Sequence, residues 1–99
     1  MKKRYIVCVN NSTEQQDQTF LNYIREQGFG WWHYLNNIWL LTDSSGKSSI
    51  KEIRDHAKVS FDDEYNMVFQ LNETEGTWSG FGPNSQTSIM FTWIKKNWK

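Results

Sequence analysis

The chain lacks several features on which whole classes of protein depend. It has a single cysteine, Cys8, so it cannot be a disulfide-stabilised scaffold. No apolar run approaches the roughly 18 residues of a membrane-spanning helix. The short apolar stretch over residues 5–9, behind a basic N-terminus, is too brief for a signal peptide. We therefore expect a cytoplasmic protein with no membrane partner.

Small side chains and net charge are also scarce. One alanine, Ala57, stands against nine Asn and nine Ser residues. The 11 basic and 11 acidic residues cancel, which argues against strong non-specific binding to duplex nucleic acid. Aromatic side chains are abundant instead, with six Trp, six Phe and four Tyr in 99 residues. So many large apolar groups argue against disorder and predict one domain, residues 1–99, whose core uses few, large side chains.

Hydrophobic periodicity predicts the element order β-α-β-β-α-β. The first strand is apolar on both faces, as in the centre of a sheet. Thr13 and Gln16 form a capping box for a helix that ends at Gly28, and Asn36-Asn37 suits a two-residue hairpin turn. The expected elements are a strand over 4–9, a helix over about 14–27, a hairpin over 29–41, a helix over about 48–58 and a strand over 65–71.

This order predicts an α+β domain with the ferredoxin-like split β-α-β fold. We expect the strand order 4-1-3-2, both helices on one face, a core over 4–71 and a C-terminal extension over 72–99. Within the extension, residues 77–81 fit a short strand, and the apolar spacing from Ser88 onward fits a helix. The basic residues cluster only near the two termini, at Lys2-Lys3-Arg4 and at Lys95, Lys96 and Lys99, and we interpret them as solvated.

The second face of the sheet also needs a cover. Counting back from the Asn36-Asn37 turn pairs Trp32 with Leu41 and Tyr34 with Trp39, which puts these four side chains on one face. A face this apolar is unusual for the exposed side of a sheet. The candidate covers are a second copy of the chain, the C-terminal segment with Trp78, or unstacked nucleic acid bases. We favour a dimer or tail interface.

Polar residues are expected to meet at one edge of this fold. The end of the first strand, the start of the first helix, the hairpin turn and the end of the second helix all lie there. Free N–H groups at the helix start suit a phosphate, which predicts a nucleotide pocket, although Asn and Ser are also ordinary turn and cap residues. His33 is either a further ligand-binding residue or a satisfied core residue. The residues at the edge are Asn10, Asn11, Ser12, Asn36, Asn37, His56, Asp62 and Asp63.

No spacing of His, Cys, Asp and Glu indicates a zinc site, and we expect neither a metal nor a cofactor.

Three segments carry a resemblance to a known family. They are Trp31-Trp32-His33-Tyr34-Leu35, then Ile38-Trp39-Leu40-Leu41, then Ile53-Arg54-Asp55. With these, the chain resembles the SinR-like proteins, small proteins similar to the dimeric ferredoxin-fold subunit of the CRISPR spacer-acquisition complex. The late Trp-Gly element of that family would be Trp78-Ser79-Gly80. The resemblance spans about residues 5–81 and implies a homodimer, a tail strand that adds to the sheet, and a setting in prokaryotic or phage defence.

Relatives in the broader superfamily are metal-dependent nucleases or adaptors for nucleic acid. The nuclease types carry an Asp at the end of the first strand, where the dimer is thought to bind a divalent ion, and the matching residue here is Asn10. An amide supplies neither the negative charge that Mg²⁺ favours nor a general base. We therefore expect a noncatalytic, homodimeric module that binds a nucleotide or short single-stranded nucleic acid. The alternatives are a metal-dependent nuclease that uses Asp62 or Asp63, and a structural or regulatory protein-binding domain.

Overall fold

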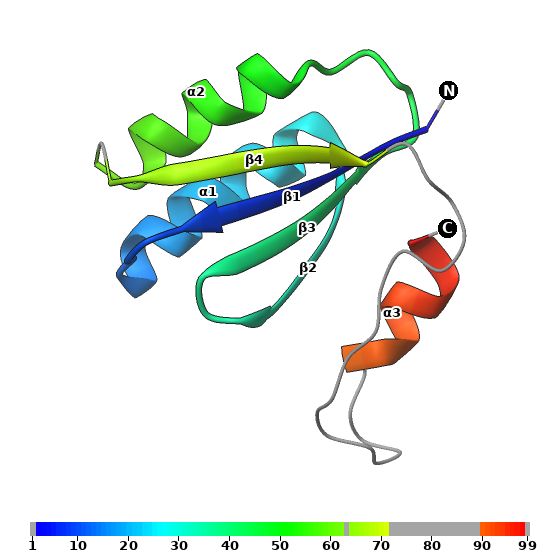
Figure 1. Cartoon of the computed structure of the whole chain (residues 1–99), viewed down its shortest axis with the longest axis horizontal. Helices are drawn as coiled ribbons and strands as arrows, with labels where there is room; N and C mark the ends of the chain where they lie inside the picture. The colour runs from blue at the N-terminus through cyan, green and yellow to red at the C-terminus, as the bar shows by residue number, and fades with distance from the viewer. Residues whose placement is uncertain (1, 63, 72–89, 99) are drawn as a thin grey trace.

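The fold is the expected α+β arrangement with an additional C-terminal helix (Figure 1). The computed structural model describes residues 2–62, 64–71 and 90–98. The strands form one antiparallel sheet in the order β2-β3-β1-β4, which confirms the ferredoxin-like topology and the predicted order 4-1-3-2. The predicted strand over 77–81 and Trp78 lie outside the described residues. The elements are β1 (Lys3–Val9), α1 (Glu14–Gln27), β2 (Gly30–Leu35), β3 (Ile38–Asp43), α2 (Ile50–Ser60), β4 (Asn66–Leu71) and α3 (Met90–Asn97).

Local signals in the sequence set the helix ends. The Thr13 hydroxyl accepts the Gln16 backbone N–H at 3.2 Å, and the Gln16 side chain accepts the Thr13 N–H at 2.9 Å. Gly28 ends α1 with φ of 73°, a left-handed conformation that glycine adopts without strain. Ser49 caps α2 by accepting the Glu52 N–H at 3.2 Å. These contacts direct both helices back across the same face of the sheet.

The main core lies between the sheet and the two helices that cover it, α1 and α2 (Figure 1). Trp39 is its largest side chain and is 1% exposed. The Phe20 ring contacts it edge-on at 5.2 Å between ring centroids. The core thus depends on large rings, as the shortage of alanine predicts. Its buried residues are Tyr5, Val7, Val9, Phe20, Tyr23, Ile24, Phe29, Trp39, Leu41, Ile53, Ala57 and Phe61.

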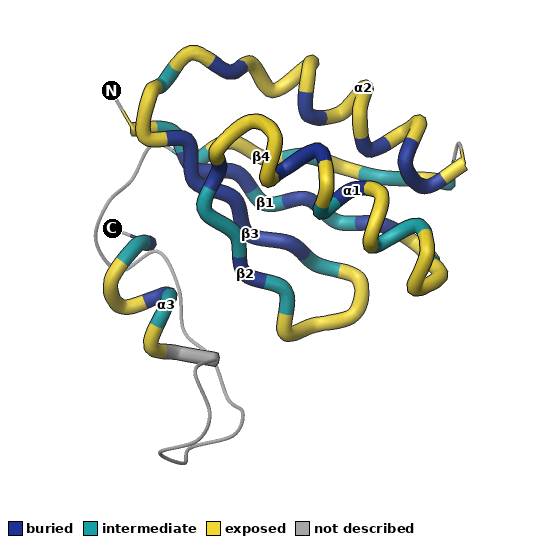
Figure 2. Tube along the Cα trace, turned by 180° about the vertical axis from the view of Figure 1, so that it is seen from behind, coloured by how far each residue is buried: buried dark blue, intermediate teal, exposed yellow. Residues whose placement is uncertain are grey.

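The opposite face of the sheet carries a second apolar cluster, which α3 covers. Ile94 and Trp98 of α3 are buried against Trp32 and Leu40, with Ile6, Ile38, Leu71 and Trp93 packed around them. Figure 2 shows the burial along the chain: the central strands β1 and β3 are largely buried, whereas the hairpin turn and the outer surface of α2 are exposed. Of the three predicted covers, the C-terminal segment is the one found on this face. The homodimer stays a prediction, which sedimentation of the purified chain tests.

The face predicted for the hairpin side chains is wrong. The turn lies at Asn36-Asn37 as expected and Leu35 pairs with Ile38, but the register then shifts, so Trp32 pairs with Leu40 instead of Leu41. The shift corresponds to one extra residue in β2, a β-bulge, and it reverses the facing of β3 relative to the count. Trp39 and Leu41 therefore belong to the helix-side core. Trp32 lies on the α3 side, where its ring is 5.5 Å from that of Tyr34.

Candidate functional site

The polar edge predicted from the sequence is a meeting point of β1, the hairpin turn and the loop before β4. The Val9 N–H donates to the Asn37 carbonyl at 2.9 Å, and the Asn10 N–H donates to the Tyr65 carbonyl at 3.0 Å. The Asn10 side-chain amide donates to Glu64 Oε1 at 3.2 Å. Asn10 and Asn37 are thus close to each other, as expected, and Asp63 lies outside the described residues.

Carboxylates surround this edge. Glu14 and Asp17 lie in the first turn of α1, and Asp62 accepts a hydrogen bond from the Gln16 side chain at 3.1 Å. Together with Glu64, they place negative charge around the helix start where a phosphate is predicted. Like charges repel most strongly where solvent is partly excluded. Asn11, Ser12 and Asn36 stay candidate ligand-binding residues at this edge, but its charge suits a neutral or cationic group better than a phosphate.

The two histidines occupy separate environments, and both rings are stacked. The His33 ring lies 3.8 Å from the Trp39 ring and nearly parallel to it. Its Nδ1 lies 2.9 Å from the Ile38 carbonyl oxygen, and because a carbonyl only accepts, Nδ1 carries the hydrogen. Its Nε2 faces Asp17 Oδ2 at 3.8 Å. His33 therefore connects the β2 irregularity to β3 and α1, which is the structural role foreseen as its alternative.

His56 is not part of the polar edge. Its ring stacks on Tyr23 at 3.9 Å, in the second half of α1, whereas the edge lies at the start of that helix. The predicted convergence of His56 with Asn10 is therefore wrong. His56 lies about halfway along α2 (Ile50–Ser60), whereas the predicted helix over about 48–58 puts it near the helix end.

An aromatic pocket that was not predicted from the sequence runs along β2. Its volume is about 370 Å³, within the range of small-molecule sites. Trp31 reaches it from the helix side of the sheet, whereas Trp32 and Trp93 belong to the α3 side. Tyr34 is 43% exposed and leaves the pocket open to solvent. The residues that line it are Phe29, Gly30, Trp31, Trp32, Tyr34 and Trp93.

Gly30 lines this pocket, and its missing side chain leaves room for Thr42 of the neighbouring strand β3. A Cβ atom at this position would lie 2.5 Å from Thr42 Oγ1 and 3.4 Å from the Trp93 ring. Thr42 is buried on the neighbouring strand and has little room to move. A glycine at the start of a strand indicates such a close approach. The glycine in the sequence therefore indicates close packing of β2 on β3, and it does not by itself indicate the pocket.

Basic residues from both ends of the chain meet at α3, the helix that contributes Trp93 to the aromatic pocket. Lys95 and Lys96 are exposed in the last turn of α3, and Lys96 lies one turn from Trp93. Lys2 Nζ donates to the Asn97 carbonyl at 2.5 Å, and the Arg4 guanidinium lies over the Trp98 ring at 5.6 Å. The two terminal clusters that look separate in the sequence thus meet at α3. Arg4 is buried and not solvated as expected, so the exposed basic surface there consists of Lys2, Lys95 and Lys96.

The β3–α2 loop is organised by a buried carboxylate, Asp43. Its Oδ1 accepts the N–H and hydroxyl of Ser45 at 3.0 and 2.7 Å, and its Oδ2 accepts those of Ser48 at 2.9 and 2.6 Å. Burial alone would raise the pKa of Asp43, but the four hydrogen bonds outweigh it and hold that pKa well below its ordinary range. The Tyr5 hydroxyl lies 2.9 Å from Ser48 Oγ and extends the network into the core. This carboxylate is a structural anchor.

Metal ligation finds no support in the part of the chain that the structure describes. Within residues 2–62, 64–71 and 90–98, no three His, Cys, Asp or Glu side chains are grouped closely enough to hold an ion. Cys8 is half-buried, and burial raises the pKa of its thiol. Over the same ranges, no helix is long and apolar enough to cross a membrane.

Comparison of the chain with protein-family models, with curated proteins and with solved structures found no match.

Proposed function

We propose that the chain is a noncatalytic binding module for a nucleotide or short single-stranded nucleic acid, whose base enters the aromatic pocket along β2. The observation that carries the proposal is the pocket itself, with aromatic walls next to a lysine-bearing helix. Every base has a flat π-face and stacks on Trp or Tyr whatever its sequence, at about 1–3 kcal/mol per base. A lysine one turn from Trp93 is placed to neutralise the phosphate that follows the base.

The distribution of charge explains how a chain of zero net charge can bind an anion. The carboxylates Glu14, Asp17, Asp62 and Glu64 gather at the start of α1, whereas Lys95 and Lys96 lie on α3. The two charge types therefore do not cancel locally. A ligand of one or a few nucleotides contacts the basic surface alone, and a long duplex would gain little from so small a patch.

The pocket also favours single strands over duplexes. Bases in a duplex are stacked on each other, so their faces are not available to Trp93 or Tyr34 unless a base leaves the stack. A volume of about 370 Å³ accommodates one base or two. We therefore assign short single strands or free nucleotides as the ligand class.

Substitution of the pocket aromatics tests the proposal. Tyr34→Ala and Trp93→Ala should each weaken the binding of labelled hexathymidylate and hexauridylate by about 5- to 150-fold, the equivalent of one lost stacking contact. The measurement is fluorescence anisotropy at fixed low salt. Tyr65→Ala is the matched control, because Tyr65 is 83% exposed and lies beside the acidic edge.

The control variant should bind like the original chain. Equal losses in Tyr34→Ala and Tyr65→Ala would place the ligand elsewhere, and the absence of binding to any oligonucleotide or mononucleotide would refute the function. Lys96→Gln should in addition reduce the salt dependence of binding by roughly 0.7 in log–log slope, as expected for one lost phosphate contact to a single strand.

A further inference from the structure

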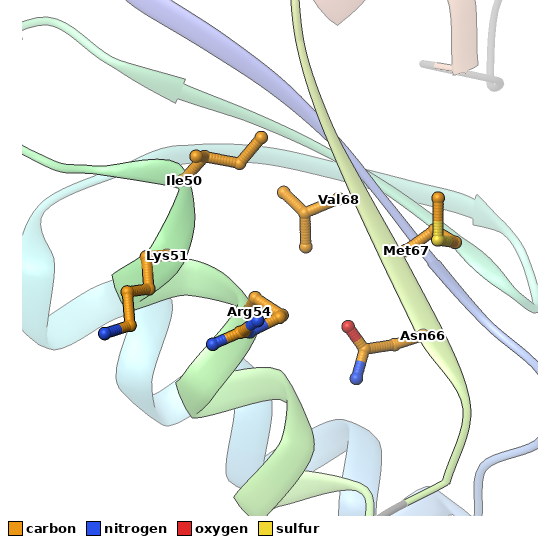
Figure 3. Close-up of a pocket in the computed structure, with 6 residues that line it drawn as sticks. All are labelled: Ile50, Lys51, Arg54, Asn66, Met67 and Val68. Carbon is orange, nitrogen blue, oxygen red and sulfur yellow. The ribbon is translucent and has the colours of Figure 1, made fainter.

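A second groove lies at the opposite edge of the sheet, between α2 and β4 (Figure 3). Its volume is about 280 Å³. In Figure 3, Ile50 and Val68 form its apolar part, Arg54 and Asn66 face each other across it, and Met67 lies on the other side of the strand. Lys51 completes the lining. The groove thus combines an apolar floor with a basic rim.

β4, the strand beside this groove, is an edge strand of the sheet formed by the described residues. β4 pairs with β1 on one side, and no strand in the described part of the chain pairs with its other side. An edge of this kind offers a row of N–H and C=O groups to an incoming strand. Asn66 Oδ1, which belongs to a lining residue, is buried and accepts no hydrogen bond. A buried acceptor without a donor is costly, so an occupant that donates an N–H would be favoured.

The side of α2 that lines the groove is predominantly positive. Lys51 and Arg54 line the groove, Lys58 follows Arg54 one turn later, and all three residues are exposed. Glu52 and His56 lie on the other flank, where His56 stacks on α1.

Arg54 already has an ion-pair partner in Asp55, at 2.8 Å, but both side chains are more than half exposed. Surface pairs of this kind contribute little, so a ligand carboxylate can compete with Asp55 for the guanidinium.

We propose that this groove binds an extended acidic segment of a partner protein, which adds to β4 as a further strand and directs carboxylates toward Lys51 and Arg54. A second copy of the chain is a poorer occupant, because antiparallel pairing of β4 with itself brings the basic flank of one α2 beside the same flank of the other. The proposal goes beyond nucleotide binding, since the β2 pocket lies at the other edge of the sheet.

Two fluorescein-labelled hexapeptides, matched in length to β4, test this assignment on the full chain. One alternates Glu with Val and Thr, and the other has Gln in place of every Glu. The acidic peptide should bind at least about 10-fold more tightly, as expected for loss of one charge-assisted contact. Arg54→Gln and Lys51→Gln should each weaken its binding to a similar extent. Asp55→Asn should strengthen its binding, because it releases Arg54 from its present partner.

Three further measurements separate the proposed mode from others. Lys95→Gln, a loss of the same charge on α3, should leave peptide affinity unchanged. Two N-methylated peptides are compared, one for each alternate set of amides. Methylation of the set that faces β4 should abolish binding, because strand addition requires these backbone donors, whereas methylation of the other set should not. The proposal is overturned if the acidic and Gln peptides bind equally, if neither binds, or if binding survives N-methylation of both sets. A dimer in sedimentation that excludes the peptide would assign the groove to a second copy and overturn it too.

Discussion

Trp39→Ala is expected to lower the free energy of unfolding by about 3–5 kcal/mol, as for other buried Trp residues. The side chain is 1% exposed and contacts the Phe20 ring at 5.2 Å and the His33 ring at 3.8 Å. Its removal leaves a cavity between α1 and the sheet that rigid neighbours fill only in part. Domains of this size have about 5–15 kcal/mol of stability in total, so the loss is a large fraction of it. Urea unfolding monitored by far-UV circular dichroism measures the effect.

Trp93→Ala provides the comparison for this variant. Trp93 is half-buried at the rim of the aromatic pocket, so its removal should cost less stability while weakening nucleotide binding. The two substitutions remove the same side chain and separate the core from the site. A smaller loss of stability for Trp39→Ala than for Trp93→Ala would mean that the hairpin register is not the one described.

Asp43→Asn is expected to remove a pH-dependent part of the stability. The native pKa of Asp43 is lowered, so its contribution is complete above the unfolded-state pKa of about 3.9 and is lost as the pH falls toward the native value. At neutral pH the variant should be less stable by about 2–3 kcal/mol, because an amide cannot accept all four hydrogen bonds from Ser45 and Ser48. The difference in free energy of unfolding between Asp43→Asn and the original chain should become smaller below about pH 4.

Urea unfolding at a series of pH values measures this difference. Asp55→Asn is the control, because Asp55 is exposed and its loss should leave the stability nearly unchanged at every pH. A difference between Asp43→Asn and the original chain that stays constant from neutral pH to about pH 2.5 would contradict the lowered pKa.

Local signals explain why the fold could be predicted. The Thr13–Gln16 capping box and Gly28 define a helix over 14–27, and the structure has α1 over Glu14–Gln27. The Asn36-Asn37 turn is also where the sequence places it. Each of these signals depends on residues a few positions apart, which is the range that propensity and capping report. With the element order known, the right-handed connections leave few topologies.

The bulge in β2 explains why the faces could not be predicted. The residues Trp31-Trp32-His33-Tyr34 are all large, so the pattern of side chains along this strand is compatible with several registers. The extra residue is stabilised by contacts across the hairpin, which the local sequence does not reveal. His33 donates to the Ile38 carbonyl and stacks on Trp39, across the hairpin. A single added residue moves every later pair to the other face. The predicted register therefore put both Trp39 and Leu41 on the wrong face of the sheet.

The aromatic pocket could not be predicted for a different reason. It joins Phe29, Gly30 and Trp32 to Trp93, which is some sixty residues further along the chain, and it exists only because α3 docks against β2. The meeting of Lys2 with Asn97 has the same origin. Sequence patterns alone do not place a C-terminal helix on a particular strand. Gly30 gives no clear clue either, because a Cβ atom there would clash with Thr42 of β3 and would only touch the Trp93 ring.

The most direct test of the proposed nucleotide site is a ¹H–¹⁵N correlation spectrum of the full chain titrated with hexathymidylate. The indole N–H signals of Trp31, Trp32 and Trp93 should shift together with the backbone amides of β2 and α3. The amide signals of Asn10 and Asn11, at the acidic edge, should not shift. Shifts confined to the acidic edge, or an unchanged spectrum at millimolar oligonucleotide, would contradict the assignment of the aromatic pocket as the binding site.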